Sequence, residues 1–386
     1  MSTTAARGFR AAGVAAGLKS QGGRDVALVV NDGPSAAAAA VFTANRVQAA
    51  PVLWSRQVVR GGRVRAVVLN SGGANACTGP DGFADTHRTA EHVAEALGLG
   101  AGEVVVCSTG LIGERLPMDR LLAGVHAAVA ALSPDADAGA WAADAIRTTD
   151  TVAKTAVHVS PAGWTIGAMA KGAGMLAPSL ATMLCVITTD AVVPAGELDD
   201  ALRHACAVSF ERIDADGCMS TNDTVLVLAN GASERTPARA QFRAALTEVC
   251  QSLAAQLLAD AEGATKEVAI EVRGAASVAD AVEVGRAVAR NNLLKCALFG
   301  NDPNWGRVLA AIGTTQAAFA ADRLDVAING VQVCRNGAAG DARELVDLSG
   351  RHITIVADLN AGTETATIYT NDLSHAYVEE NSAYSS

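Results

Sequence analysis

Short runs of aliphatic and β-branched residues alternate along the first half of the chain with alanine-rich stretches whose apolar positions recur every three or four residues. The short runs are typical of buried β-strands and the periodic stretches of amphipathic α-helices. We expect strands at four runs, namely 25–30, 37–43, 65–70 and 103–108. We expect helices over 81–98 and from Pro117 onwards, because proline is favoured in a first helical turn. Residues 155–160 and 163–172 are expected to pair as a hairpin.

The second half of the chain repeats the same alternation. Five further runs predict strands, and they cover residues 181–191, 224–231, 267–274, 324–333 and 352–359. Helical spacing predicts helices over 196–213 and over 241–263, the second with a continuous apolar stripe. The turn-rich segment 300–307 is expected to be a loop. The alternation of both element types predicts an α/β fold, and no Pro/Ser-rich linker marks a domain boundary.

Composition narrows the class of protein. The chain has 386 residues, a length typical of two domains, and half of them are apolar. The net charge of −10 and the lack of a basic cluster argue against nucleic acid as a partner, because phosphate contacts need Lys and Arg. No apolar window approaches the ~20 residues of a membrane span, and the N-terminus has no signal-peptide core. We therefore expect a cytoplasmic protein without a membrane partner.

The eight cysteines stand singly, mostly inside apolar runs, so we expect buried thiols in a reducing compartment. Neither the cysteines nor the seven histidines show metal-ligand spacing, and no phosphate-binding glycine motif is present. The sequence thus predicts no metal site and no nucleotide cradle. Asp214, Asp216, Asp223 and the loop 301–307 are interpreted as supporting groups rather than catalytic ones.

The segment KGAGMLAPSLATMLCVITTDA, residues 171–191, holds the candidate chemistry. It places Thr182 after a glycine-rich loop, at the start of an apolar strand. A threonine at that place is usually structural, because Thr favours strands. Gly172 and Gly174 permit close backbone approach, and Lys171 adds a cation beside the loop, so a catalytic threonine is the alternative.

Seven further blocks of the chain contribute to the interpretation of this segment. They are NSGGANACTG (70–79), CSTGLIGERLPMD (107–119), RTTDT (147–151), STNDT (220–224), DAEGATK (260–266), NDPNWGR (301–307) and DLSHAYVEENSAYSS (372–386). Together with KGAGMLAPSLATML, they resemble the ornithine acetyltransferase (glutamate N-acetyltransferase) family, ArgJ, in the family's order and over nearly the whole chain.

The resemblance implies an enzyme of arginine biosynthesis that cuts itself between Ala181 and Thr182. The products would be an α chain (1–181) and a β chain (182–386), assembled as an α2β2 heterotetramer. Thr182 would then be an N-terminal nucleophile. A threonine hydroxyl needs a base, and the α-amine released by the cut has a pKa near 8, so it can take that proton.

The resemblance also implies roles for other residues. Thr109 and Gly110 would form the oxyanion hole, since an attacked acyl carbonyl needs fixed donors. The substrate contacts would be Thr148, Lys171, Thr182, Glu262, Asn381 and Ser386. We expect Lys171 to bind a carboxylate and Glu262 an amino group. The implied fold has layered sheets and helices of the ArgJ/DmpA-like type, with Thr182 on a central strand and a smaller C-terminal α/β domain.

The implied reaction moves an acetyl group from N2-acetyl-L-ornithine to L-glutamate through an acetyl ester on Thr182. It needs no cofactor, although acetyl-CoA is a second acetyl donor for some family members. The alternatives are an amidase or aminopeptidase with the same N-terminal threonine, an acyltransferase of a specialised pathway, and a non-catalytic binding protein of the same fold.

Overall fold

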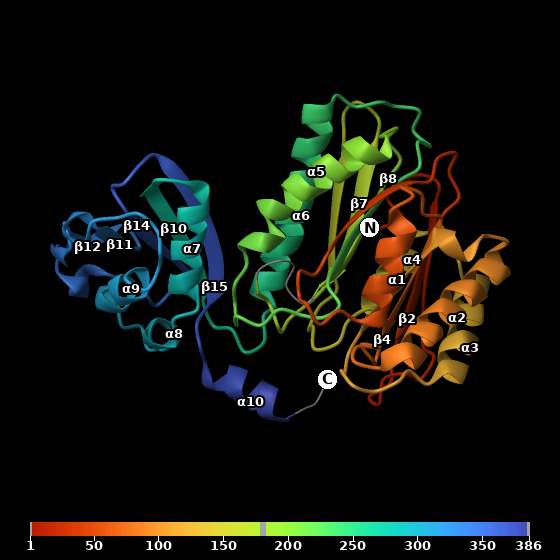
Figure 1. Cartoon of the computed structure of the whole chain (residues 1–386), viewed down its shortest axis with the longest axis horizontal. Helices are drawn as coiled ribbons and strands as arrows, with labels where there is room; N and C mark the ends of the chain where they lie inside the picture. The colour runs from red at the N-terminus through yellow and green to blue at the C-terminus, as the bar shows by residue number, and fades with distance from the viewer. Residues whose placement is uncertain (1, 178–182, 384–386) are drawn as a thin grey trace.

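The computed structural model describes residues 2–177 and 183–383, which form a four-layer body and a C-terminal unit (Figure 1). The first sheet has the strand order β1-β2-β4-β5. Its strands are β1 (Phe9–Val14), β2 (Val26–Asn31), β4 (Ala66–Ser71) and β5 (Val104–Thr109). Only β4 and β5 run parallel. The strands predicted at 25–30, 65–70 and 103–108 are confirmed here.

The second sheet has the order β3-β9-β8-β7-β6. Its strands are β3 (Ala37–Phe42), β6 (Lys154–Val159), β7 (Thr165–Lys171), β8 (Leu184–Thr189) and β9 (Thr224–Ala229). The central strand β8 is antiparallel to β7 and parallel to β9. The predicted hairpin is β6–β7. Ala181 and Thr182 lie outside the described residues, and the described strand begins at Leu184.

The two sheets pack face to face, and helices cover their outer faces. Val29 and Leu69 of the first sheet share a core with Val186 and Leu228 of the second. The outer face of the first sheet is covered by α2 (Gly79–Leu97) and α3 (Met118–Ala130), and that of the second by α5 (Ala195–Ala207) and α6 (Arg239–Ala259). Helices α1 (Ala50–Val59) and α4 (Ala136–Ala145) add to the core between the sheets. The α/β fold class is confirmed.

The C-terminal unit is a six-stranded sheet, in the order β13-β12-β11-β14-β10-β15, with helices on one face (Figure 1). Its strands are β10 (Glu267–Ala275), β11 (Asp325–Ile328), β12 (Val331–Arg335), β13 (Ala338–Ala339), β14 (His352–Asp358) and β15 (Glu364–Asn371). Its helices are α7 (Val278–Ala289), α8 (Asn292–Phe299) and α9 (Trp305–Ile312). Helix α10 (His375–Ala383) follows β15 and returns towards the four-layer body. The predicted smaller C-terminal α/β unit is therefore present.

Three predicted elements have different bounds. The helix expected over 196–213 ends at Ala207 and is followed by a separate 3-10 turn, because Ser209 has φ −131° and ψ −91°, outside the helical region. The strand expected over 324–333 is two strands, because Asn329 and Gly330 both adopt positive φ and form a hairpin turn. The expected loop 300–307 is helical from Trp305.

Five of the eight cysteines are buried, as predicted, and all eight are free thiols. None of the described helices combines the length and apolar character that a membrane span requires.

Candidate active site

A cavity of ≈ 200 Å³ opens where loops from both sheets meet the C-terminal helix. Six residues singled out from the sequence line it, and they are Thr109, Gly110, Thr148, Lys171, Glu262 and Asn381. They come from the ends of β5 and β7, the loops around 148 and 262, and α10. Thr182 and Ser386, also predicted for this site, lie outside the described residues. Residues separated by more than 270 positions thus converge on one cavity.

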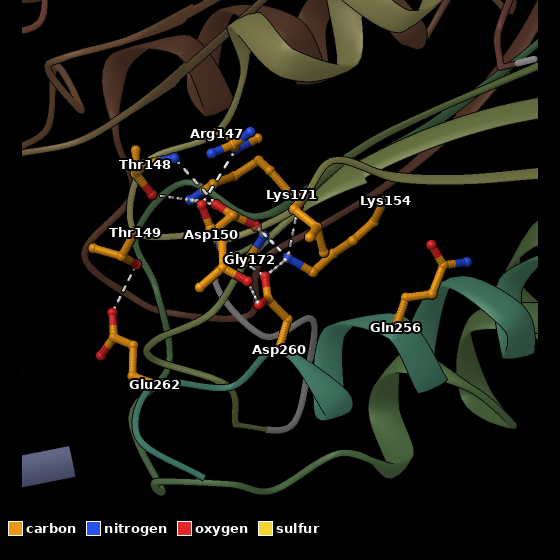
Figure 2. A network of polar contacts seen from close by, with 12 residues as sticks. Arg147, Thr148, Thr149, Asp150, Lys154, Lys171, Gly172, Gln256, Asp260 and Glu262 are labelled. Atoms are coloured by element: carbon orange, nitrogen blue, oxygen red, sulfur yellow. Dashed lines mark hydrogen bonds and ion pairs between the residues drawn. The ribbon is translucent and has the colours of Figure 1, made fainter. Parts of the chain in front are cut away.

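Lys171 is the cation of this cavity and is 2% exposed. Its Nζ donates to Thr148 Oγ1 at 2.6 Å and to Thr109 Oγ1 at 3.3 Å, and it lies 3.9 Å from Asp150 Oδ2 (Figure 2). Burial lowers the pKa of Lys171, while the negative charge of Asp150 opposes that shift. The carboxylate therefore helps to keep a buried positive charge at the cavity wall.

Asp150 is fixed by a network beneath the cavity (Figure 2). Its Oδ1 accepts hydrogen bonds from Lys154 Nζ at 2.7 Å and from the Gly172 amide at 2.5 Å. Burial alone would raise the pKa of Asp150, but the charges of Lys171 and Lys154 prevail and lower it to about 2. Lys154 Nζ also lies 2.5 Å from Asp260 Oδ2, so carboxylate and ammonium groups alternate in this network. Sequence reasoning missed Asp150, although it lies within the RTTDT block.

The loop after β5 carries the predicted oxyanion donors. The amides of Gly72 and Gly73 each donate to the Thr109 carbonyl at 3.0 Å. Gly110 has φ +131°, and a Cβ there would lie 2.5 Å from the Gly73 nitrogen, so only glycine fits. Because the Thr109 hydroxyl accepts a hydrogen bond from Lys171, its own proton is left to donate elsewhere. The NSGGANACTG and CSTGLIGERLPMD blocks thus contact each other closely through their glycines.

Asn222 supports this loop from the other side and was not assigned a role from the sequence. Its Nδ2 donates to the Ser108 carbonyl at 2.8 Å and to the Ala74 carbonyl at 2.7 Å. The Ser108 hydroxyl in turn donates to Asn70 Oδ1 at 2.6 Å. The STNDT block contains Asn222, but the carbonyl groups that its side chain binds lie more than 110 residues away in the sequence.

Glu262 is the acidic group of the cavity and is 8% exposed. Its Oε1 accepts the Thr149 hydroxyl at 2.7 Å, which orients the carboxylate. A Cβ on Gly174 would lie 2.7 Å from both carboxylate oxygens, so glycine at 174 leaves the room that Glu262 occupies. An acid and a cation therefore stand in one cavity, as expected for a zwitterionic ligand.

The C-terminal tail contributes Asn381, which lines the cavity from α10. The start of this helix approaches the loop after Glu262 closely, because the Ser374 hydroxyl donates to the Gly263 carbonyl at 2.5 Å. A Cβ on Gly263 would lie 2.1 Å from the Tyr377 nitrogen. The described part of the tail ends at Ala383. Among the described residues, no group of three or more His, Cys, Asp or Glu could hold a metal ion.

Comparisons with known proteins agree on one family. The model of the ArgJ family matches residues 10–386. The arginine biosynthesis bifunctional protein ArgJ of Streptomyces avermitilis is 66% identical over 100% of both chains. A solved structure of an ornithine acetyltransferase complexed with ornithine, from Mycobacterium tuberculosis, is 60% identical, covering 47% of this chain and 96% of that one, with a TM-score of 0.46. A solved ArgJ protein from Bacillus halodurans is 34% identical, covering 52% of this chain and 98% of its own, with a TM-score of 0.50.

Proposed function

The chain belongs to the ArgJ family, and from this premise we propose that it transfers acetyl groups through an ester on Thr182. It is an ornithine acetyltransferase of arginine biosynthesis, that is, a glutamate N-acetyltransferase. Because its relatives are named bifunctional, we propose an amino-acid N-acetyltransferase activity as the second one. We propose acetyl-CoA as the donor of that second activity and no cofactor for the first.

The observation that carries the proposed site is the convergence of six family positions on one cavity. Lys171 and Glu262 supply opposite charges at its wall. Ornithine and glutamate share an α-carboxylate, which Lys171 is suited to bind, while Glu262 is suited to an amino group. Neutral walls would give neither substrate a partner for its charges.

In the proposed cycle, the Thr182 hydroxyl attacks the acetyl carbonyl of N2-acetyl-L-ornithine. Its proton passes to the free α-amine of the same residue, and the carbonyl oxygen becomes an oxyanion bound by Thr109 and Gly110. The C–N bond breaks, ornithine leaves with that proton, and the acetyl group stays as an ester. The glutamate amine then attacks the ester, giving N-acetyl-L-glutamate and restoring the hydroxyl.

The α-amine exists only if the chain is cut, so we propose cleavage between Ala181 and Thr182. The chains 1–181 and 182–386 would assemble as α2β2 in the cytoplasm. The described residues before the proposed cut support its place, since Lys171, Gly174 and Met175 line the cavity. The solved Bacillus halodurans chain, about half the length of this one, is also consistent with a cut family member.

Intact-mass analysis beside a transfer assay tests this function. We expect two fragments that divide at Ala181–Thr182, and a single uncut chain for Thr182→Ala. We expect one equivalent of ornithine per enzyme to be released from N2-acetyl-L-ornithine without glutamate, and any further release to require glutamate. Release of acetate at the same rate without glutamate would instead identify an amidase, and an uncut wild-type chain with transfer activity would exclude the proposed nucleophile.

A further inference from the structure

The loop before β9 holds the chain on both sides of the predicted cut. On the upstream side, the Leu176 amide donates to Asp216 Oδ2 at 3.1 Å. On the downstream side, the Met183 amide donates to Asp223 Oδ1 at 3.0 Å. Two aspartates of one loop therefore bind the described residues on either side of the segment that holds the predicted cut.

Of these two carboxyl groups, only that of Asp223 keeps an oxygen in reserve. Both oxygens of Asp216 accept backbone amides, from Leu176 and from Cys218. Asp223 is 1% exposed, and its Oδ2 has no hydrogen-bond partner among the described residues. An unpartnered buried oxygen is costly, so it needs an explanation.

One hydrogen bond ties the Asp223 carboxyl to the residue that follows Thr182. Met183 directly follows Thr182, so the Thr182 hydroxyl is never more than about 5 Å from the Met183 nitrogen, whatever its conformation. That nitrogen is the one that donates to Asp223 at 3.0 Å. Asp223 therefore binds the backbone amide that directly follows Thr182 in the chain, which makes its second oxygen a candidate acceptor for the Thr182 proton.

The cut itself lacks a base in the proposed cycle. The α-amine of Thr182 becomes free only after cleavage, and an amide nitrogen cannot take a proton. Glu262 is oriented by Thr149, and Lys171 donates its protons to two threonines. The uncut chain therefore needs a base other than the α-amine of Thr182.

We propose that Asp223 is the general base of self-cleavage, an inference that rests on the proposed Thr182 chemistry. Its Oδ2 takes the proton as the Thr182 oxygen attacks the Ala181 carbonyl carbon. The Ala181–Thr182 C–N bond then breaks, and the carboxyl returns the proton to the departing nitrogen, leaving an ester and a free amine. Water attacks the ester, the alkoxide of Thr182 leaves and is protonated, and Ala181 ends as a carboxylate.

The electrostatics of the group suit this role. Burial raises the pKa of Asp223 well above its usual range, while hydrogen bonds and the charge of Lys171 on β7 oppose that rise. In the same loop, burial and the negative charges of Asp216 and Asp223 raise the pKa of the Cys218 thiol. A carboxylate with a raised pKa is a stronger base than an exposed one.

The test is a pulse–chase of the full-length chain in cell-free translation, followed by the rate of cutting. Asp223→Asn retains an oxygen that can accept the Met183 amide but cannot take a proton. We expect it to slow cleavage by at least about 100-fold, within the range of general-base catalysis. The matched control is Asp214→Asn, because Asp214 lies in the same loop, is equally buried and has one unpartnered oxygen, yet pairs with Arg290. It should cut at the wild-type rate.

Wild type and Thr182→Ala are measured in parallel, so that a failure of the proposed maturation can be distinguished from a failure of the proposed role of Asp223. If wild type stays uncut, the proposed maturation is wrong. If wild type is cut, Thr182→Ala is not, and Asp223→Asn cuts as fast as wild type, only the role of Asp223 is wrong. Should Asp223→Asn misfold, the wild-type rate is measured across pH 5.5–8.5. A rise with pH supports a carboxyl base, and a flat profile overturns it.

Discussion

Lys171 Nζ and Thr148 Oγ1 lie 2.6 Å apart, and this hydrogen bond joins the end of β7 to the loop before β6. The same nitrogen reaches Thr109 at 3.3 Å. One buried ammonium group therefore orders three segments of the cavity wall at once. Its removal should change substrate binding and loop geometry together.

Replacing Lys171 by methionine keeps the length of the side chain and removes its charge. We expect kcat/KM for N2-acetyl-L-ornithine to fall about 100-fold, mainly through KM, because a carboxylate loses a buried partner. Steady-state kinetics of the cut enzyme measure this effect. Lys266→Met is the control, since Lys266 is also buried but donates to the Leu348 carbonyl in the C-terminal unit. An equal loss of kcat/KM in both variants would contradict the assignment.

Asp150→Asn tests the network beneath the cavity. The pKa of Asp150 is lowered to about 2, so its stabilising effect is fully present above pH 4 and is lost as pH falls towards 2. A shift of this size corresponds to about 2 kcal/mol. We expect urea denaturation to show a less stable variant at pH 7, with a difference that shrinks between pH 4 and pH 2. A difference independent of pH over that range would assign the loss to packing instead.

Gly110→Ala should disable the oxyanion loop. An alanine Cβ would lie 2.5 Å from the Gly73 nitrogen, so the loop must move away from the carbonyl that it serves. We expect kcat to fall about 100- to 1,000-fold, the effect of losing one oxyanion donor. Gly113→Ala is the matched control, because Gly113 also has positive φ but nothing within 4 Å of its Cβ position. Transfer assays in which both variants retain wild-type kcat would exclude this loop.

Asn222→Asp tests the support of the same loop. Aspartate cannot donate to the carbonyls of Ser108 and Ala74. We expect kcat to fall about 10- to 100-fold with little change in KM, because small displacements of catalytic donors are costly. Asn230→Asp at the far end of β9 is the control, since that side chain donates to the Arg7 carbonyl away from the cavity. It should lower stability without lowering kcat.

Asp214→Asn should make stability less dependent on pH. Burial raises the pKa of Asp214 to about 6 against the opposing charge of Arg290. The folded state thus favours the protonated acid, and stability falls as pH rises from about 4 to 6. We expect the melting temperature of the wild type to drop more over this interval than that of the variant. Parallel curves for the two proteins would show that Asp214 does not titrate there.

The fully buried strands were predictable because both of their faces are apolar. Strands β2, β4, β5 and β9 are buried along their whole length and appear in the sequence as continuous aliphatic runs. Strand β15 was missed, because the polar residues Glu364, Thr365 and Thr367 interrupt its apolar positions. The turn at Asn329–Gly330 was overlooked inside an apolar run, although Asn-Gly is a strong hairpin signal.

The site residues came from a resemblance, and physical patterns alone would not have joined them. Thr148 and Lys171 are 23 positions apart, and neither lies in a spacing that indicates contact. Asp150 and Asn222 act through partners on other loops, so local sequence carries no sign of their contacts. Only the folded chain shows that two residues without an assigned role, Asp150 and Asn222, hold the assigned ones in place.

The second sheet places β8 and β9 between β3 on one side and β7 and β6 on the other. A cut before residue 183 would therefore leave two polypeptides whose strands interlock within one hydrogen-bonded surface. The two chains could not dissociate without unfolding the core, so the cut enzyme would unfold as one cooperative unit. Once unfolded, however, it must reassemble by a second-order encounter, and heat inactivation of the mature form becomes effectively one-way on dilution.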